Sequence, residues 1–316
     1  MQQTDHQSGV LAATAAYLLW GVLPLFWKLF DTVSPGEVLA HRVIWSLVFM
    51  IGILAIRKQL HSAWEEFIFI FSHFRSAIGI ILASCFISLN WFIFIWAVNS
   101  DRVIEASLGY YINPLLNVLL GVLFLKETFT RWQIVSFVLA FLGVTIMTLY
   151  YGVVPWTALL LGLSFGLYGL IKKIVNAGAM VGLTVETLLV TPVAFLYLYW
   201  IHHQPAFNSA FGLTHVDTTL LLIGSGAATA IPLLLFAIGA RRISLSLIGF
   251  LQYMAPTIML LLGIFLFNEP FSNVQFLAFL LIWIGLIIFT TSKTPAFQKF
   301  TAKFSRSKPQ QKQKAC

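Results

Sequence analysis

The chain has 316 residues, of which 59% are hydrophobic and only 9% are charged. Soluble domains carry about 25% charged residues, so this composition excludes an ordinary soluble enzyme or binding module. The net charge of +8 does not indicate nucleic-acid binding, because seven of the Lys and Arg residues lie after Ser292 without any acid, as in a basic cytoplasmic tail. Long apolar runs recur along the chain and predict an all-α polytopic membrane protein.

Ten apolar segments follow one another, each about as long as the roughly 20 residues that cross a bilayer core. We predict membrane helices over 10–30, 38–56, 78–98, 103–125, 132–150, 154–172, 183–201, 218–239, 243–267 and 273–292. Between the second and third of these, segment 61–75 has the pattern of an amphipathic helix on the membrane surface. It also fits a loop that leads into the third span.

The distribution of basic residues predicts the orientation of the chain. If the N-terminus is cytoplasmic, the loops on that side hold nine Lys and Arg residues and those on the other side hold two. Cytoplasmic loops carry the excess of positive charge in membrane proteins. We therefore predict that both termini are cytoplasmic.

Two parts of the sequence align at a fixed separation of 142 residues. Segment 110–133 matches segment 252–275, and the shared residues include Pro114 with Pro256, Gly121 with Gly263 and Glu127 with Glu269. Each half holds five predicted spans. Because five is odd, the second half enters the membrane from the opposite side, which gives the inverted repeat common among secondary transporters.

This repeat predicts the domain organisation. We expect a cytoplasmic N-terminus over 1–9, a first five-helix repeat over 10–150, a second, inverted repeat over 151–292 and a basic cytoplasmic tail over 293–316.

Four stretches carry a resemblance to a known family: "AAYLLWGVLPLFWK" from Ala15, "EVLAHRVIWS" from Glu37, "LNWFIFIWAVN" from Leu89 and "EASLGYYINPL" from Glu105. Together with the repeat, they resemble the EamA-type drug/metabolite transporter superfamily and are most similar to its RarD group, the chloramphenicol-sensitive permeases. The resemblance implies ten helices around a central cavity, a bacterial inner (cell) membrane location and transport of metabolites. It implies no particular substrate, because the group is named for a drug phenotype.

Arg42 is the strongest candidate for a substrate-binding residue. It lies about one turn inside the second predicted span. An arginine at the centre of a membrane helix costs about 2.5–3.5 kcal/mol on insertion scales. Trp45, Ser46 and Phe49 share its helix face. A guanidinium on such a face is suited to binding a carboxylate. The alternatives are snorkelling to the outer interface and a purely structural role.

Glu105 is the predicted partner of Arg42, because it lies at a similar depth in the fourth span. An ion pair would offset part of the cost of burying both charges. Substrate would then compete for Arg42, or a proton for Glu105. His41 is a second candidate for a proton-coupling residue.

Further candidates lie on the fourth helix and elsewhere. The face that carries Tyr110 also holds a proline, and interrupted helices at equivalent places in the two halves indicate a midplane site. Ordinary helix packing is the alternative. The remaining candidate substrate-binding residues are Trp45, Trp20, Asn90, Trp91, Tyr110, Asn113, Asn117 and Gln252, and the candidate helix breaks are Pro24, Pro114, Pro232 and Pro256.

These observations favour a secondary transporter of small organic metabolites or drugs that works by alternating access, with coupling to protons left open. The alternatives are a membrane-embedded enzyme acting on a lipid-linked substrate, a channel and a lipid flippase. We predict no catalytic residues, no metal site and no cofactor, and no phosphate-binding loop indicates direct use of ATP. The expected partners are a small-molecule substrate and the lipid bilayer, without nucleic acid, and the sequence leaves homo-oligomer formation open.

Overall fold

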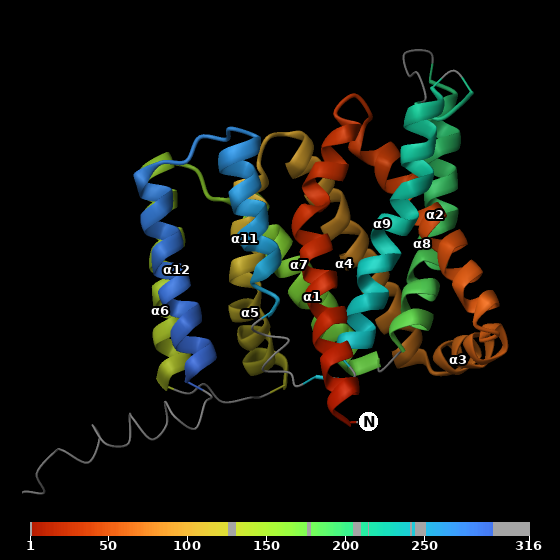
Figure 1. Cartoon of the computed structure of the whole chain (residues 1–316), viewed down its shortest axis with the longest axis horizontal. Helices are drawn as coiled ribbons and strands as arrows, with labels where there is room; N and C mark the ends of the chain where they lie inside the picture. Colours follow the sequence, from red (N-terminus) through yellow and green to blue (C-terminus); the bar gives the residue numbers. More distant parts are fainter. Residues whose placement is uncertain are drawn as a thin grey trace, which may run out of the picture. The chain divides into compact units, whose positions relative to one another are not determined.

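The structure is a computed structural model that describes residues 2–125, 131–175, 178–204, 210–213, 215–240, 242–243 and 251–292. Every regular element in these ranges is helical (Figure 1). The elements are α1 (Gln2–Trp27), η1 (Lys28–Phe30), α2 (Pro35–Ile56), α3 (Leu60–Ser72), α4 (Phe74–Asn99), α5 (Val103–Leu125), α6 (Arg131–Tyr151), α7 (Trp156–Val175), α8 (Ala179–His202), α9 (Val216–Ala240), α11 (Met254–Leu261), η2 (Leu262–Leu266) and α12 (Asn273–Thr291).

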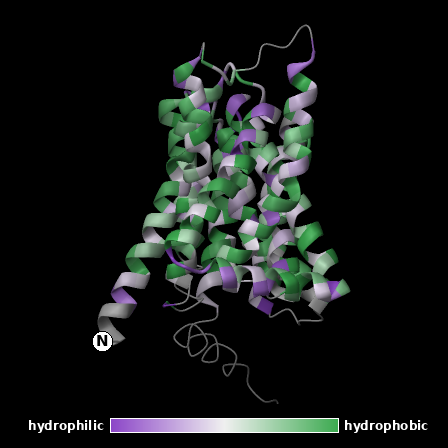
Figure 2. Cartoon of the chain, turned by 90° about the vertical axis from the view of Figure 1, so that its right-hand side faces the viewer, coloured by the Kyte–Doolittle hydropathy of each residue, from purple (hydrophilic) through white to green (hydrophobic). Residues whose placement is uncertain are grey.

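The helices have the length and composition of membrane spans. Within the described residues, seven helices are long and apolar enough to cross a bilayer, and Trp156–Lys172 and Met254–Leu266 form two shorter apolar helices. Figure 2 shows apolar residues along the helices and hydrophilic residues mainly toward their ends. The predicted class of all-helical membrane protein is therefore confirmed. The segment before α4 is a separate short helix, α3, and not a loop.

The predicted span over 243–267 is wrong as a single continuous helix. Within the described part of that span, Gln252 and Tyr253 form a turn, α11 begins at Met254, and the last residues form the π-helix η2. Pro256 explains the late start. Its ring would clash with the carbonyl of the residue four positions earlier in a continuous helix, but it is tolerated in the first turn of a helix.

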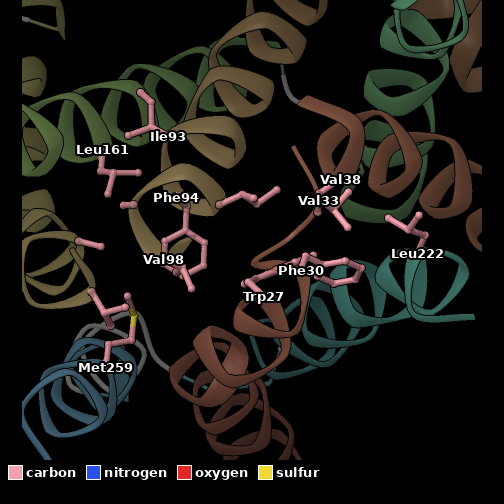
Figure 3. Close-up of a cluster of buried hydrophobic side chains, with 14 residues drawn as sticks. Trp27, Phe30, Val33, Val38, Ile93, Phe94, Val98, Leu161, Leu222 and Met259 are labelled. Carbon is pink, nitrogen blue, oxygen red and sulfur yellow. The ribbon is translucent and has the colours of Figure 1, made fainter. Parts of the chain in front are cut away.

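The chain divides into two compact units. In the larger unit, which holds α1 to α5, α7 to α9 and α11, α2 packs against α8 and α9, and α7 packs against α4 and α5. Figure 3 shows a cluster of buried apolar side chains that most of these helices share. Trp27, Phe30, Phe94, Leu161 and Met259 are members of it. The cluster has members on eight elements, among them α1, α2, α4 and α9, so it fixes the positions of the helices that carry the candidate site.

The smaller unit contains α6 and α12, which touch through two reciprocal contacts. A Cβ atom on Gly143 would lie 2.8 Å from the carbonyl oxygen of Ala278, and one on Gly285 would lie 2.9 Å from the carbonyl oxygen of Ser136. Ser136 and Ala278 are 142 residues apart, and so are Gly143 and Gly285. Each helix therefore presents a glycine to the equivalent backbone position of the other, which allows a close approach.

Glu269 ties the end of the π-helix to the start of α5. Its carboxylate accepts hydrogen bonds from the backbone N–H groups of Val103 at 2.7 Å and Ile104 at 2.9 Å. These groups have no partner within the helix itself, so a buried carboxylate there acts as a helix cap. Asn268 precedes it with a φ of 52°, a left-handed conformation that asparagine tolerates.

We expect Glu269→Gln to destabilise the protein by about 1–2 kcal/mol, because one cap acceptor is replaced by an amide donor. Burial raises the pKa of the Glu269 carboxyl above its ordinary value, although the two backbone N–H groups oppose this. The folded state therefore binds the proton more tightly than the unfolded state. The associated stability is complete below the ordinary glutamate pKa of about 4.3 and is lost as the pH rises through the raised value.

Thermal unfolding in detergent at several pH values measures both effects. The Gln variant should have a lower Tm than the parent. Its Tm should also fall less as the pH rises from about 4.3 through the raised pKa of Glu269. Asp101→Asn is the control, because Asp101 is an exposed carboxylate that pairs with Lys28, and its φ of 54° suits asparagine. A Glu269→Gln protein as stable as the control would contradict the capping role.

Candidate functional site: a buried arginine between two tryptophans

Arg42 is the eighth residue of α2, which begins at Pro35. The start of this helix is fixed locally, because the Ser34 side chain accepts the N–H of Glu37 and a proline occupies the first helical position. At 1.5 Å per residue, Arg42 lies about 10 Å inside the helix. Its side chain is 5% exposed. The snorkelling alternative, which needs an accessible guanidinium, is therefore not supported.

Two tryptophans cover the guanidinium of Arg42. Its Cζ lies 4.7 Å from the ring centroid of Trp27 and 4.3 Å from that of Trp91. A cation over an aromatic face gains about 2 kcal/mol when both groups are desolvated. Trp27 comes from α1 and Trp91 from α4, so three helices meet at this cation.

A threonine orients the same guanidinium. Arg42 Nε donates to Thr229 Oγ1 at 2.8 Å, and the Thr229 hydroxyl donates onward to the carbonyl of Ser225 at 2.9 Å. Thr229 lies on α9, which approaches α2 closely at Gly226. Because Nε is already bonded, an added ligand would meet the guanidinium at its Nη atoms.

Arg42 Nη1 is buried and has no hydrogen-bond acceptor among the described residues. The same holds for Nε1 of Trp27, whose ring covers the guanidinium, and for Nε1 of Trp45, which lies three residues after Arg42 on α2. Buried polar groups are nearly always paired, and an unpaired one costs about 1–3 kcal/mol. All three are donors, so a bound group that pairs with them must supply acceptors. Within the described residues, the site is thus complementary to an oxyanion.

On the fourth predicted helix, α5, Tyr110 packs against the apolar cluster that holds Trp27, and Asn113 lies about one turn further along. The Tyr110 ring packs edge-on against Phe94 and Phe165, with ring centroids 5.8 and 6.4 Å apart. The Asn113 side-chain oxygen is buried and has no hydrogen-bond partner among the described groups. The side chains of Pro114 and Asn117, two further predicted residues of this helix, lie outside the described residues.

The structure does not bring Arg42 and Glu105 together. Glu105 Oε1 accepts the backbone N–H of Thr157 at 3.1 Å, and Oε2 lies 3.5 Å from Arg102 Nη1. Glu105 therefore holds the start of α7, and the predicted ion pair with Arg42 is not formed. The role of Glu105 in proton coupling stays a prediction.

The other predicted residues fall in several places. Two of them share a neighbour in Phe211: the buried His41 ring stacks on it at 4.6 Å between centroids, and the Trp45 ring centroid lies 6.4 Å from it. Trp20 packs instead with Tyr17 and Phe236 in a separate aromatic cluster.

The remaining predicted residues contribute to packing and backbone geometry. The Asn90 amide donates to the Leu161 carbonyl at 2.9 Å and to Ser164 Oγ at 3.0 Å, which ties α4 to α7. Gln252 lies in the turn before α11. Helix α1 continues through Pro24, and α9 continues through Pro232, so neither proline ends its helix.

Trp27 and Thr229 were not among the predicted site residues. Trp27 lies two helical turns after Trp20, on the same face of the predicted helix, and this spacing is the sequence signal that could have identified it. Thr229 stands in the small-residue stretch "SGAATA" and contacts Arg42 across 187 residues of sequence, so local pattern alone does not identify it. Within the described residues, no group of three or more His, Cys, Asp or Glu side chains could hold a metal ion.

Comparisons with known proteins agree on a family. The model of the EamA-like transporter family matches residues 7–149 and again residues 154–291. The uncharacterized transporter YojE of Bacillus subtilis is 46% identical over 294 residues, covering 93% of this chain and 97% of its own. Protein RarD of Salmonella typhimurium is 40% identical over 289 residues, covering 92% of this chain and 96% of its own.

A more distant relative and a solved structure extend these findings. The chloramphenicol-sensitive protein RarD of Pseudomonas aeruginosa is 28% identical over 284 residues, which cover 89% of this chain and 92% of its own. A protein crystal structure aligns with a TM-score of 0.59 at 20% sequence identity and covers 90% of this chain and 97% of that one. At this identity the alignment shows a shared fold alone.

Proposed function

The chain belongs to the EamA-like transporter family, and from that premise we propose that it is a secondary transporter of small organic solutes carrying a carboxylate or a similar anionic group. It is a membrane transporter and not an enzyme, which removes one alternative reading of the sequence. A small-molecule substrate and a membrane follow from the family.

The buried guanidinium of Arg42 carries the proposal for the substrate class. A charge within a membrane helix is costly and marks a functional site by default. Here the charge is held by two indole faces and one threonine, while Nη1 and two indole N–H groups have no acceptor among the described residues. An anionic substrate supplies both the opposite charge and the acceptors.

Alternating access between two inverted repeats is the proposed mechanism. It is supported by the two successive family matches and by the reciprocal glycine contacts of α6 and α12. Tyr111 and Tyr253, which are also repeat equivalents, stack with their ring centroids 6.4 Å apart. Two copies related by an axis in the membrane plane can exchange conformations, so that one site opens to either side.

The finer architecture and the location complete the proposal. We propose that the protein has ten spans in two five-helix repeats, 10–150 and 151–292, around a central cavity. Both termini then lie on the cytoplasmic side of a bacterial inner membrane. The family matches and the bacterial relatives support the halves and the membrane, and the basic loops support the orientation.

A thermal-shift measurement on the purified protein tests the substrate class. Hippurate and its uncharged analogue hippuramide have the same shape, so the pair isolates the carboxylate. A ligand at 100 times its Kd adds about 2.7 kcal/mol of apparent stability. We expect hippurate to raise the Tm of the parent protein, hippuramide to have little effect, and Arg42→Gln to lose the response.

The same test is extended to a set of aliphatic and aromatic carboxylates, each compared with its amide. Equal stabilisation by acid and amide, or a carboxylate response that survives in Arg42→Gln, would contradict the proposal. Counterflow of labelled hippurate in proteoliposomes separates a carrier from a channel, because trans-stimulated exchange requires a carrier. Lipid scrambling in the same vesicles would indicate the flippase alternative.

A further inference from the structure

A second charged group lies inside the membrane helices, on α8. Glu186 is the eighth residue of this helix, and its carboxylate is 1% exposed. Its Oε1 lies 2.7 Å from Lys172 Nζ, and its Oε2 accepts the Tyr168 hydroxyl at 3.1 Å. Lys172 and Tyr168 are one turn apart on α7, so this cluster joins two helices through side chains alone.

The Glu186 cluster lies toward the opposite end of the larger unit from Arg42. Helices α2 and α8 pack together and run in opposite directions (Figure 1). Arg42 and Glu186 are each the eighth residue of their helix, so each lies about 10 Å from its own helix start. Lys172 is 19% exposed and lies three residues before the end of α7, so its ammonium group is within reach of water at that end.

Both hydrogen-bonded oxygens of Glu186 meet side chains of a neighbouring helix, whereas several described glutamates accept backbone N–H groups. Glu105 accepts a backbone N–H at a helix start, and Glu269 accepts two. Glu37 on α2 accepts the backbone N–H of Ala210 at 3.0 Å. Backbone caps hold a carboxylate in one place, whereas a lysine on a neighbouring helix can leave it when the helices move apart.

The charge state of Glu186 is therefore linked to the contact between α7 and α8. With Lys172 in place, the carboxylate stays ionised as half of a buried pair. Removing one partner of such a pair leaves an uncompensated buried charge, which costs about 3–5 kcal/mol. A carboxylate inside a span avoids this cost by taking up a proton.

Helices packed against α8 carry other titratable or charged groups. They are Glu37, His41 and Arg42 on α2, His61, Glu65 and Glu66 on α3, Arg75 and Cys85 on α4, and Asp217 on α9. Glu66 Oε1 accepts the N–H of Gly178 at 2.7 Å, just before α8. Lys172 and Tyr168 are the groups that bond to the Glu186 carboxylate.

Aromatic contacts connect this cluster with the Arg42 site. Tyr168 packs on Phe165 at 5.9 Å between centroids, and Phe165 packs on Tyr110 at 6.4 Å. Tyr110 packs against the apolar cluster that holds Trp27, one of the two indoles over Arg42. Phe165, Tyr168 and Lys172 all belong to α7. A movement of this helix therefore alters the surroundings of both the arginine and the glutamate.

We infer that Glu186 is the proton-binding site of this transporter, ionised while Lys172 and Tyr168 hold it and protonated when α7 separates from α8. The proton comes from water on the side where Lys172 is exposed, and it returns there when the ion pair forms again. This inference rests on the proposed transport function. It assigns coupling to Glu186 in preference to Glu105 and His41, which the sequence indicated.

Infrared difference spectroscopy of the reconstituted protein tests the inference without any substrate. The membrane is stepped from neutral to acidic buffer, and the carbonyl stretch of protonated carboxylic acids is recorded. We expect one band to be missing in Glu186→Gln and retained in Glu105→Gln and His41→Gln. Lys172→Met should show that band already in neutral buffer, because the carboxylate has lost its cation. A Glu186→Gln spectrum identical to that of the parent would overturn the inference.

A flux measurement tests the coupling itself. In proteoliposomes, Glu186→Gln should retain hippurate counterflow, which needs no net proton movement. It should lose accumulation driven by a pH gradient, down to the level of protein-free liposomes. Counterflow in the parent without gradient-driven accumulation would overturn the inference and leave the proposed function intact. Absence of hippurate counterflow in the parent would count against the proposed function, and the infrared result then decides the role of Glu186 as a proton site.

Discussion

Gly226→Val is expected to prevent stable folding, whereas Gly224→Val should leave the protein folded. A Cβ atom at Gly226 would collide with the carbonyl carbon of Trp45, and it would lie 2.5 Å from the carbonyl oxygen of Trp45 and 2.7 Å from the backbone nitrogen of Ser46. These are backbone atoms of α2, so they cannot rotate away. Separating α2 from α9 would cost about 3 kcal/mol or more, as overpacking a helix contact does.

Gly224 provides the matched control for this prediction. It lies two residues earlier on the same helix, and nothing lies within 4 Å of a Cβ atom built there. Both variants are compared by their yield of monodisperse protein in detergent and by thermal unfolding, with Gly226→Ala as a milder step. A Gly226→Val protein with the Tm of the parent would show that α2 and α9 are not in the contact described.

The same contact also sets the geometry of the site. Thr229 follows Gly226 by one turn of α9, so the close approach of the two helices places its hydroxyl against Arg42 Nε. In Gly226→Ala, we therefore expect carboxylate binding to weaken even where the protein still folds.

Arg42→Met should give a protein that is more stable than the parent and does not bind carboxylates. Replacing a buried charge that has no carboxylate beside it by an apolar side chain of similar length removes a desolvation cost. We expect a gain on the order of 1–3 kcal/mol, after the loss of the threonine hydrogen bond and the indole contacts. A purely structural arginine would show the opposite, a loss of stability.

Lys172→Met is the control for this change, because it exchanges the same charge type at a site where the cation is paired. Removing Lys172 leaves Glu186 without its partner, so the Tm should fall. Thermal unfolding of the two variants, with and without hippurate, gives both stability and binding. A lower Tm for Arg42→Met would refute the interpretation of Arg42 as a strained functional charge.

The sequence was sufficient for the membrane class, most helix positions and the importance of Arg42. Apolar length and loop charge identify spans because a bilayer imposes them on each segment separately. Arg42 was found for the same reason, since a charge in an apolar run is visible locally. Pro256 indicated a break before α11. The residue at which the helix begins could not be predicted, because it depends on how the chain relieves the clash between the proline ring and the preceding carbonyl groups.

The partners of Arg42 were harder to predict, because they come from distant parts of the chain. Glu105 was chosen for its depth and charge, yet its nearest donor is the backbone N–H of Thr157. Trp27 and Thr229 carry no charge that marks them, and only the packing of α1 and α9 brings them to the guanidinium. Complementary charge along a sequence is thus a weaker guide than the geometry of helix contacts.

The reciprocal glycine contacts of α6 and α12 have the form of a dimer interface contained in one polypeptide. In a symmetric homodimer, a residue i that contacts residue j of the other subunit implies that j also contacts i, and every substitution appears in both subunits. A buried arginine would then be present in two copies, each with its own desolvation cost. Joining two such units by gene duplication and fusion removes that constraint. The first half can keep Arg42, and the second half can keep the pair of Lys172 and Glu186, without a second copy of either arrangement.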